Sequence, residues 1–191
     1  MVLTTAYFPP VEYFARLAGY SSVYIEACEN YQKQSYRNRC LIYAADGVQM
    51  LNFPVKHVGG SFELPIREIE VDYSTPWLVR TERCIDTAYR SAAYYDYYRD
   101  SVFAILDSRP RTLWELNTAL TEYFIEKLGL RTELVPTSSY SGEAVEIHPK
   151  KPSDYVAKPY WQVFSGKRGF IPNLSVMDLL FNEGPGAICC L

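Results

Sequence analysis

The segment VLTTAYFPPVEYFARLAGYSSVYIEA, residues 2–27, determines the first part of the fold. Val2 to Phe8 is apolar and rich in β-branched residues, which predicts a strand that Pro9-Pro10 ends. Val11 to Leu17 places apolar side chains at helical intervals. Ser22 to Ala27 again has the composition of a strand. The segment therefore predicts a β-α-β unit.

Further along the chain, Asp46-Gly47 lies between two β-rich runs, Arg39 to Ala44 and Val48 to Val55. Asp-Gly in that position is a strong signal for a β-hairpin. Two more short strands are expected, at Ile69 to Tyr73 and at Leu130 to Val135.

The second half of the chain is predominantly helical in its spacing. Helices are expected over Trp77 to Tyr89, over Tyr97 to Leu106 and in a short final segment, Ser175 to Phe181. Thr112 and Glu115 have the spacing of a capping box, and the helix they open ends near Gly129. The fold class is therefore α+β: a mixed sheet with an early β-α-β unit and a hairpin, and helices concentrated in the second half.

The composition indicates one domain, 1–191, with enough apolar material for its own core. Of 191 residues, 48% are hydrophobic and 15% are aromatic. No segment has the composition of a linker between domains. Residues 137–159 are polar and contain proline, which predicts a long loop of the kind that is often functional.

Charge and cysteine content exclude several functions. A net charge of −3 and a sequence pI of about 5.5 argue against a general nucleic-acid binder, which usually has a broad basic face. No apolar stretch is long enough to span a membrane. The five cysteines fit neither a zinc site nor a redox motif, so we expect no metal and no cofactor, and a reducing, cytoplasmic location. The sequence does not determine the oligomeric state.

The segment from Asn30 to Cys40 is the strongest candidate for a binding site. It carries three cations, Lys33, Arg37 and Arg39, and no acidic residue. Arginine offers a planar fork of donors that matches phosphate or carboxylate. An anionic small molecule, such as a nucleotide sugar, is one occupant that these residues suit. The alternative is a solvated turn whose arginines pair with nearby acids.

A nucleophile is a weaker candidate. Cys40 with His57 or His148 as base would follow the logic of a catalytic triad. Cys40, however, begins an apolar strand, where cysteine is usually inert packing.

The sequence also resembles a known family in several short motifs that occur in order. Tyr7-Phe8-Pro9-Pro10-Val11-Glu12-Tyr13-Phe14 resembles the opening of the WbqC-like protein family, and residues 33–39 resemble its Lys-x-x-Trp/Tyr-x-Asn-Arg segment. The resemblance continues through residues 52–55, Ile69 with Trp77, residues 88–95 and residues 178–184, so the whole chain would be one WbqC-like domain. One departure is Thr81, because family members often have His four residues after the matching tryptophan.

This resemblance implies a bacterial protein of surface-polysaccharide biosynthesis, such as O-antigen or capsule. It also implies a transferase that attaches an acyl or aminoacyl group to a nucleotide-linked amino sugar. If the histidine of relatives is a catalytic base, Thr81 leaves this chain without it.

Two hypotheses follow. In the first, the protein is such a transferase: cations of the loop hold phosphate, Tyr36 and Asn38 orient the sugar, Tyr7 lines the same cleft, and the acid–base group is unassigned. In the second, it is a non-catalytic module that binds a nucleotide sugar or another protein. The expected binding residues are the same in both: Lys33, Tyr36, Arg37, Asn38, Arg39 and Tyr7.

Overall fold

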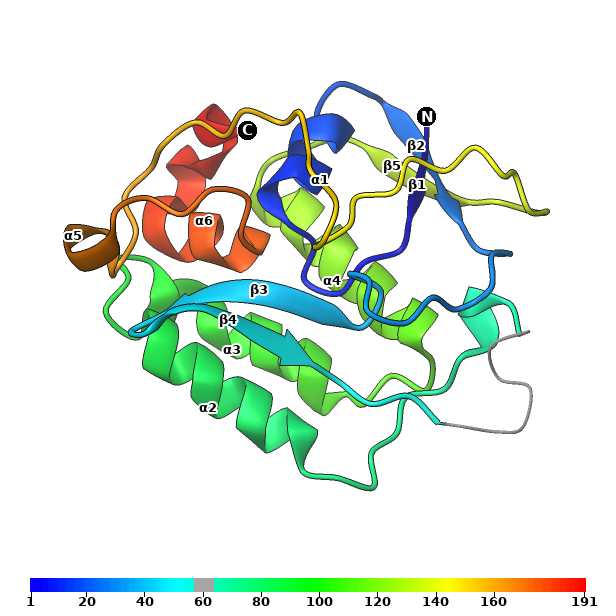
Figure 1. The fold of residues 1–191 in the computed structure, drawn as a ribbon, viewed down its shortest axis with the longest axis horizontal. Helices are drawn as coiled ribbons and strands as arrows, with labels where there is room; N and C mark the ends of the chain where they lie inside the picture. Colours follow the sequence, from blue (N-terminus) through cyan, green and yellow to red (C-terminus); the bar gives the residue numbers. More distant parts are fainter. Residues whose placement is uncertain (57–63) are drawn as a thin grey trace.

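The N-terminal unit consists of two parallel strands joined by a helix, as the sequence predicts (Figure 1). In the computed structural model, which describes residues 1–56 and 64–191, β1 spans Val2–Thr4, α1 spans Val11–Leu17 and β2 spans Ser22–Glu26. β1 ends earlier than expected because the backbone after Thr4 leaves the sheet. There the Tyr7 N–H donates to the Tyr36 carbonyl at 2.8 Å.

The strands form two sheets. β5, Glu133–Pro136, pairs in parallel with β2, so that the first sheet has the order β1-β2-β5. β3, Arg39–Ala44, and β4, Gly47–Asn52, form the antiparallel hairpin that Asp46-Gly47 predicts. The α+β class is confirmed, but its parallel and antiparallel pairs do not share one mixed sheet. The hairpin instead packs against helices that follow it in the chain.

The expected strand at Ile69 to Tyr73 is wrong. Residues in this stretch make only isolated bridges, from Val71 to Val55 and from Glu70 to Thr112. The Val71 N–H donates to the carbonyl of Arg111, so the stretch divides its hydrogen bonds between two neighbours. A ladder needs consecutive pairs with one partner, and this stretch forms none with the residues that the structure describes.

The helices lie where their apolar spacing places them. α2 spans Trp77–Tyr89, α3 spans Tyr95–Asp107 and α4 spans Leu113–Lys127. The capping box of α4 is confirmed: the Thr112 hydroxyl accepts from the Glu115 N–H, and the Glu115 carboxylate accepts from the Thr112 N–H. The remaining helical segments are α5 (Ser165–Arg168), α6 (Val176–Glu183), and the 3-10 helices η1 (Ile66–Glu68) and η2 (Gly184–Cys190).

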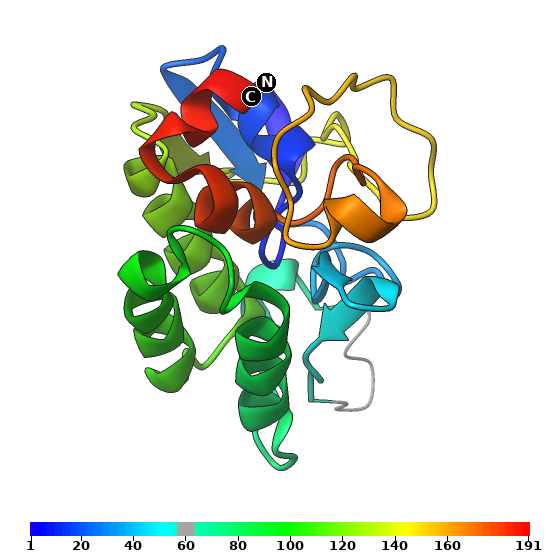
Figure 2. The same cartoon turned by 90° about the vertical axis from the view of Figure 1, so that its left-hand side faces the viewer.

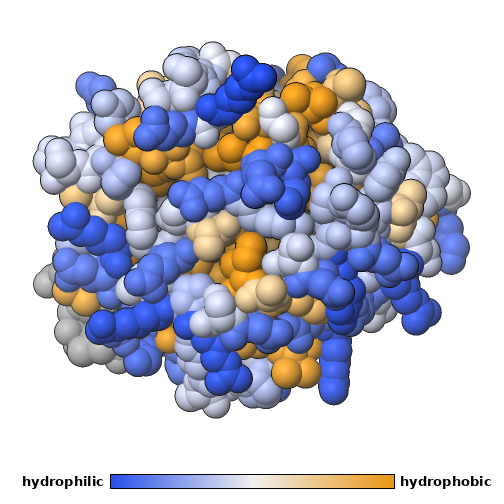
Figure 3. Space-filling model, turned by 180° about the vertical axis from the view of Figure 1, so that it is seen from behind, coloured by the Kyte–Doolittle hydropathy of each residue, from blue (hydrophilic) through white to orange (hydrophobic). Residues whose placement is uncertain are grey.

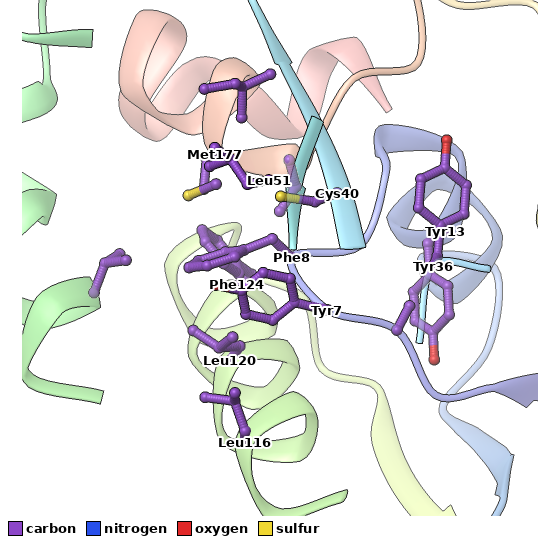
Figure 4. Packing of buried hydrophobic residues seen from close by; sticks show 14 of the residues in the cluster. Tyr7, Phe8, Tyr13, Tyr36, Cys40, Leu51, Leu116, Leu120, Phe124 and Met177 are labelled. Atoms are coloured by element: carbon purple, nitrogen blue, oxygen red, sulfur yellow. The ribbon is translucent and has the colours of Figure 1, made fainter. Parts of the chain in front are cut away.

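One core joins both sheets and the helices. Phe124 of α4 lies against Phe8 and Phe14, with ring centroids 6.1 Å apart in each pair. Figure 4 shows Cys40 of β3 beside Leu51 and Met177, above the aromatic rings of this cluster. The face opposite to that of Figure 1 is largely hydrophilic, with separate hydrophobic areas between charged side chains (Figure 3).

The long loop predicted over residues 137–159 contains neither helix nor strand. A fully buried carboxylate, Glu26 at the end of β2, holds its start. This carboxylate accepts from the Thr137 hydroxyl at 2.8 Å, and from the N–H and hydroxyl of Ser141 at 2.9 and 2.7 Å. Within the described ranges, no helix is both long and apolar enough to cross a membrane.

Candidate functional site

The loop that connects β2 to β3 is a built structure rather than a solvated turn. The Ser35 hydroxyl donates to the Gln32 carbonyl at 2.8 Å, and Gln34 adopts a positive φ of 61°. The Asn117 amide of α4 donates to the Arg37 carbonyl at 2.8 Å, and Asn38 donates to the Phe53 carbonyl at the same distance. The backbone of the predicted binding segment is therefore held on two sides by the core.

Arg37 faces the interior and is neutralised there. Its side chain is only 2% exposed, and its Nε and Nη2 donate to the two carboxylate oxygens of Glu29 at 2.7 and 2.5 Å. Burial raises the pKa of Glu29, and the Arg37 guanidinium opposes that rise. Such a buried bidentate pair fixes the loop and leaves Arg37 little freedom to bind an outside anion.

Four of the other five predicted residues differ in how far they are exposed. Lys33 is exposed, whereas Tyr36 and Asn38 are buried. Tyr7 is fully buried, and burial raises its pKa, while an interaction of its hydroxyl with the Thr81 side chain opposes that rise. The structure therefore does not gather all six side chains around one cavity.

Arg39 differs from Arg37 because it lies at the surface of the hairpin. Its Nη1 contacts the thioether sulfur of Met50 at 3.5 Å, and its register partner across the hairpin is Asn52. Its Nε is shielded from solvent and has no acceptor within the described part of the chain. Burial raises the pKa of the neighbouring Tyr31, and Arg39 acts against that rise. Within the described part of the chain, no ion pair joins Arg39 to an acid.

A cleft lies next to Arg39, between β4 and α2. We call it the arginine cleft, and its cavity volume is about 350 Å³. The two elements lie side by side in both ribbon views (Figures 1 and 2). The residues that line it are Gln49, Met50, Leu51, Asn52, Pro54, Thr75, Trp77, Arg80, Thr81 and Cys84.

Helix α2 divides its charges between two sides. Its acids face α3: the Asp86 carboxylate accepts from Arg99 Nε at 2.9 Å and from the Tyr95 hydroxyl. Arg80 lies on the cleft side and is exposed, and it forms no ion pair with an acid in the described ranges. Arg80 is the cation among the described lining residues, and Arg39 lies outside the lining but contacts one lining residue, Met50. A guanidinium group without an acid partner among the described residues suits an anion.

The floor of the cleft contains Thr81, the position at which the family resemblance predicts a histidine in many members. Thr81 is buried and lines the cleft, and the phenol of Tyr7 lies behind it against Phe53, with ring centroids 4.8 Å apart. The cleft has no carboxylate and no histidine among its described lining residues. It can therefore hold and orient an anionic ligand, but these residues supply no conventional general base.

The proposed nucleophile has no support in its surroundings. Cys40 is fully buried, and burial raises its thiol pKa well above the ordinary value, so the reactive thiolate is disfavoured. His148 lies in the long loop, and His57 lies outside the described residues. No group of three His, Cys, Asp or Glu side chains in the described ranges could hold a metal ion.

Sequence reasoning missed the cleft but not all of its parts. Arg39 was expected to bind an anion, and Asn52, Pro54 and Trp77 belong to motifs that carry the family resemblance. Arg80 was not predicted, although it follows Trp77 by three residues in α2. That spacing puts both residues on one side of a helix and is the signal that could have found it.

Comparisons with known proteins agree with the motifs. The model of the WbqC-like protein family matches residues 5–151, which is more than half of the chain. A protein of Mycobacterium tuberculosis named "Uncharacterized protein Rv1507c" is 27% identical over 219 aligned positions, which cover 97% of this chain and 94% of that protein. No solved structure matches the chain.

Proposed function

Because the chain belongs to the WbqC-like protein family, we propose that it is a transferase of bacterial surface-polysaccharide biosynthesis. It attaches an acyl or aminoacyl group to a nucleotide-linked amino sugar, in the cytoplasm. The resemblance to the family supplies the reaction class. The arginine cleft supports the substrate class, because Arg80 lines a cavity of about 350 Å³ and Arg39 contacts Met50 in its lining, and neither arginine has an acid partner among the described residues.

The phosphates of the nucleotide sugar would contact Arg39 and Arg80. Both side chains offer several N–H donors to phosphate oxygens, and a protein of net charge −3 gains local attraction for an anion only where its cations are uncompensated. The amides of Asn52 and Gln49 would hydrogen-bond the uncharged part of the ligand. Lys33 stays a predicted contact at the loop surface.

The buried members of the loop would act indirectly. Arg37, held by Glu29, fixes the backbone from which Arg39 extends, and Asn38 ties the same backbone to Phe53. Tyr7 supports Thr81 from behind. Tyr36 supports the loop through its carbonyl, which accepts from the Tyr7 N–H. These four residues are positioning residues in the proposal, rather than groups that touch the ligand in the cleft.

A non-catalytic module that binds a nucleotide sugar is the second candidate. The specific observation in its favour is that the described cleft lining has no carboxylate or histidine, with Thr81 where relatives often have histidine. Acyl transfer to an amine requires a group that removes a proton from the attacking nitrogen. Binding requires none.

One experiment separates the two candidates. Purified protein is screened by thermal shift against UDP-, dTDP- and GDP-linked amino sugars, and each mixture is then incubated with acyl-coenzyme A or an aminoacyl thioester. Mass spectrometry detects the acylated sugar. A ligand-induced shift together with product supports the transferase, and a shift without product supports the binding module. No shift with any nucleotide sugar contradicts both.

A further inference from the structure

A second cavity lies between α1 and the long loop. Its volume is about 390 Å³, and it shares no lining residue with the arginine cleft. The charged side chains that line it are of both signs: Glu12, Arg16, Glu146, Lys151 and Asp154. We call it the mixed-charge pocket.

One wall of this pocket holds a buried and fixed carboxylate. Glu12 of α1 is 2% exposed. Its Oε1 accepts from Nε and Nη2 of Arg16 at 3.0 and 2.6 Å, and its Oε2 accepts from the Asn173 amide at 3.0 Å. Burying a carboxylate is costly unless such partners satisfy it. The pocket is therefore a built polar site rather than a gap between surface loops.

The opposite wall brings a second carboxylate against two cations. Glu146 Oε1 lies 3.9 Å from Nη1 of Arg37, and its Oε2 contacts Nζ of Lys151. Burial raises the pKa of Glu146, but Lys151 and Arg37 lower it more, so the net shift is downward and Glu146 is ionised at neutral pH. Arg37 thus also helps to keep the carboxylate of this wall ionised.

His148 adds a neutral donor. Its Nδ1 accepts from the N–H of Lys150 at 3.1 Å, so the proton of the neutral ring is on Nε2. Burial lowers the pKa of His148, which keeps the ring neutral at pH 7. The side chain therefore presents an N–H donor, which suits a carboxylate or carbonyl oxygen.

We propose that the mixed-charge pocket binds a free α-amino acid. A simple anion would meet Glu12 and Glu146, and a simple cation would meet Arg16 and Lys151, so each is opposed by part of the pocket. A small zwitterion satisfies both signs at once. Its carboxylate would bind Lys151 Nζ and His148 Nε2–H, and its ammonium would bind the Glu146 carboxylate.

The remaining walls suit an uncharged side chain. Leu41, Ile147, Pro149, Pro172 and the ring of Tyr36 line the same cavity. An amino acid with a modest apolar side chain would therefore fill the pocket better than a charged one. This inference goes beyond the proposed function, because binding of the free amino acid requires neither the nucleotide sugar nor turnover.

The test is isothermal titration of the full chain with the twenty proteinogenic amino acids, followed by the N-acetyl and methyl ester derivatives of the one that binds best. The variants are Glu146→Gln and Lys151→Met. The matched control replaces a surface pair outside the pocket, Glu126→Gln with Lys127→Met, in which Lys127 Nζ and Glu126 Oε1 are 2.7 Å apart. Lys151 is 61% exposed, so its replacement tests binding without endangering the fold.

We expect at least one amino acid to bind, both derivatives to bind about tenfold or more weakly, and each pocket variant to lose a similar factor while the control keeps its affinity. Binding of none of the twenty would overturn the proposal. Equal binding of the N-acetyl derivative, or unchanged affinity in both pocket variants, would do so too. Nucleotide sugars are absent from the titration, so its failure leaves the arginine cleft untouched.

Discussion

Arg37 and Arg39 are two residues apart, and the fold uses them in opposite ways. Arg37 is 2% exposed and bonded through two nitrogens to Glu29. Arg39 is partly exposed, contacts Met50, and has no acid partner among the described residues. An arginine that the fold pairs with a buried acid stabilises the structure, and an arginine without such a partner can bind a ligand. The buried arginine should therefore control stability and the open one should control binding.

The largest expected effect follows from breaking the buried pair. Arg37→Ala should lower the free energy of unfolding by about 3–5 kcal/mol, because it leaves the Glu29 carboxylate buried without a cation. Urea denaturation at pH 7 measures the change. The loss should be smaller near pH 4, since the raised pKa of Glu29 lets it bind a proton there. A loss below about 1 kcal/mol, the scale of a surface pair, would contradict the comparison.

Asp178 extends the comparison to a buried acid whose described hydrogen-bond partners are neutral. Asp178 is fully buried, and among the described residues its Oδ2 accepts from two neutral groups, the Tyr160 hydroxyl and the Gln162 amide, each at 2.8 Å. Burial raises its pKa from 3.8 to about 6, and these hydrogen bonds offset part of the rise. The folded state therefore binds the proton more tightly than the unfolded chain does. This contribution to stability is complete below pH 4 and is lost as pH rises through 6.

The corresponding measurement compares wild type with Asp178→Asn by urea denaturation from pH 4 to pH 8. A rise from 3.8 to about 6 corresponds to roughly 3 kcal/mol. Wild type should lose stability relative to the variant by an amount of that order as pH increases. A difference between the two proteins that stays constant with pH would show that Asp178 does not titrate abnormally.

Removing the N-terminal cap of α4 should have a smaller effect on the free energy of unfolding. Thr112→Ala removes the hydroxyl that accepts from the Glu115 N–H, in a hydrogen bond of 3.1 Å at the start of α4. Loss of such a cap costs about 1 kcal/mol. Thr112→Ser keeps the acceptor and should stay close to wild type. Equal losses in both variants would indicate that the methyl group, rather than the cap, is responsible.

The smallest effect is expected in an exposed ion-pair cluster. Glu70 contacts Lys56 Nζ at 2.7 Å and Arg111 Nη2 at 2.6 Å, and these partners hold its pKa at about 2. Water screens charges at this surface, so Glu70→Gln should leave the urea midpoint unchanged within error. A clear shift of the urea midpoint would contradict the claim that exposed ion pairs contribute little to the stability of this protein.

Signals that act within a few residues predicted much of the fold. Asp46-Gly47 determines its hairpin through local turn geometry, and Thr112 with Glu115 caps α4 within one turn. The same reasoning failed at residues 69–73, because their partners, Val55 and the segment near Thr112, come from two different parts of the chain. Local composition cannot show which neighbour a short extended segment will meet.

The candidate site was less predictable for the same physical reason. Arg39 lies beside a cleft whose other wall comes from α2, about forty residues later in the chain. The pairing of Arg37 with Glu29 depends on the path of the seven residues between them, through the turn at Gln34. Three cations in one segment were visible in the sequence, but which of them an acid would neutralise depended on tertiary packing.

The most direct test of the account is a calorimetric titration with inorganic pyrophosphate, a stand-in for the diphosphate of a nucleotide sugar. Wild type is compared with Arg39→Gln/Arg80→Gln and with a control that replaces two exposed arginines outside the cleft, Arg67→Gln/Arg131→Gln. We expect the control to bind as wild type does, and the cleft variant to bind at least about tenfold more weakly with the same thermal stability. Equal affinity in all three proteins would contradict the claim that the arginine cleft is the anion site.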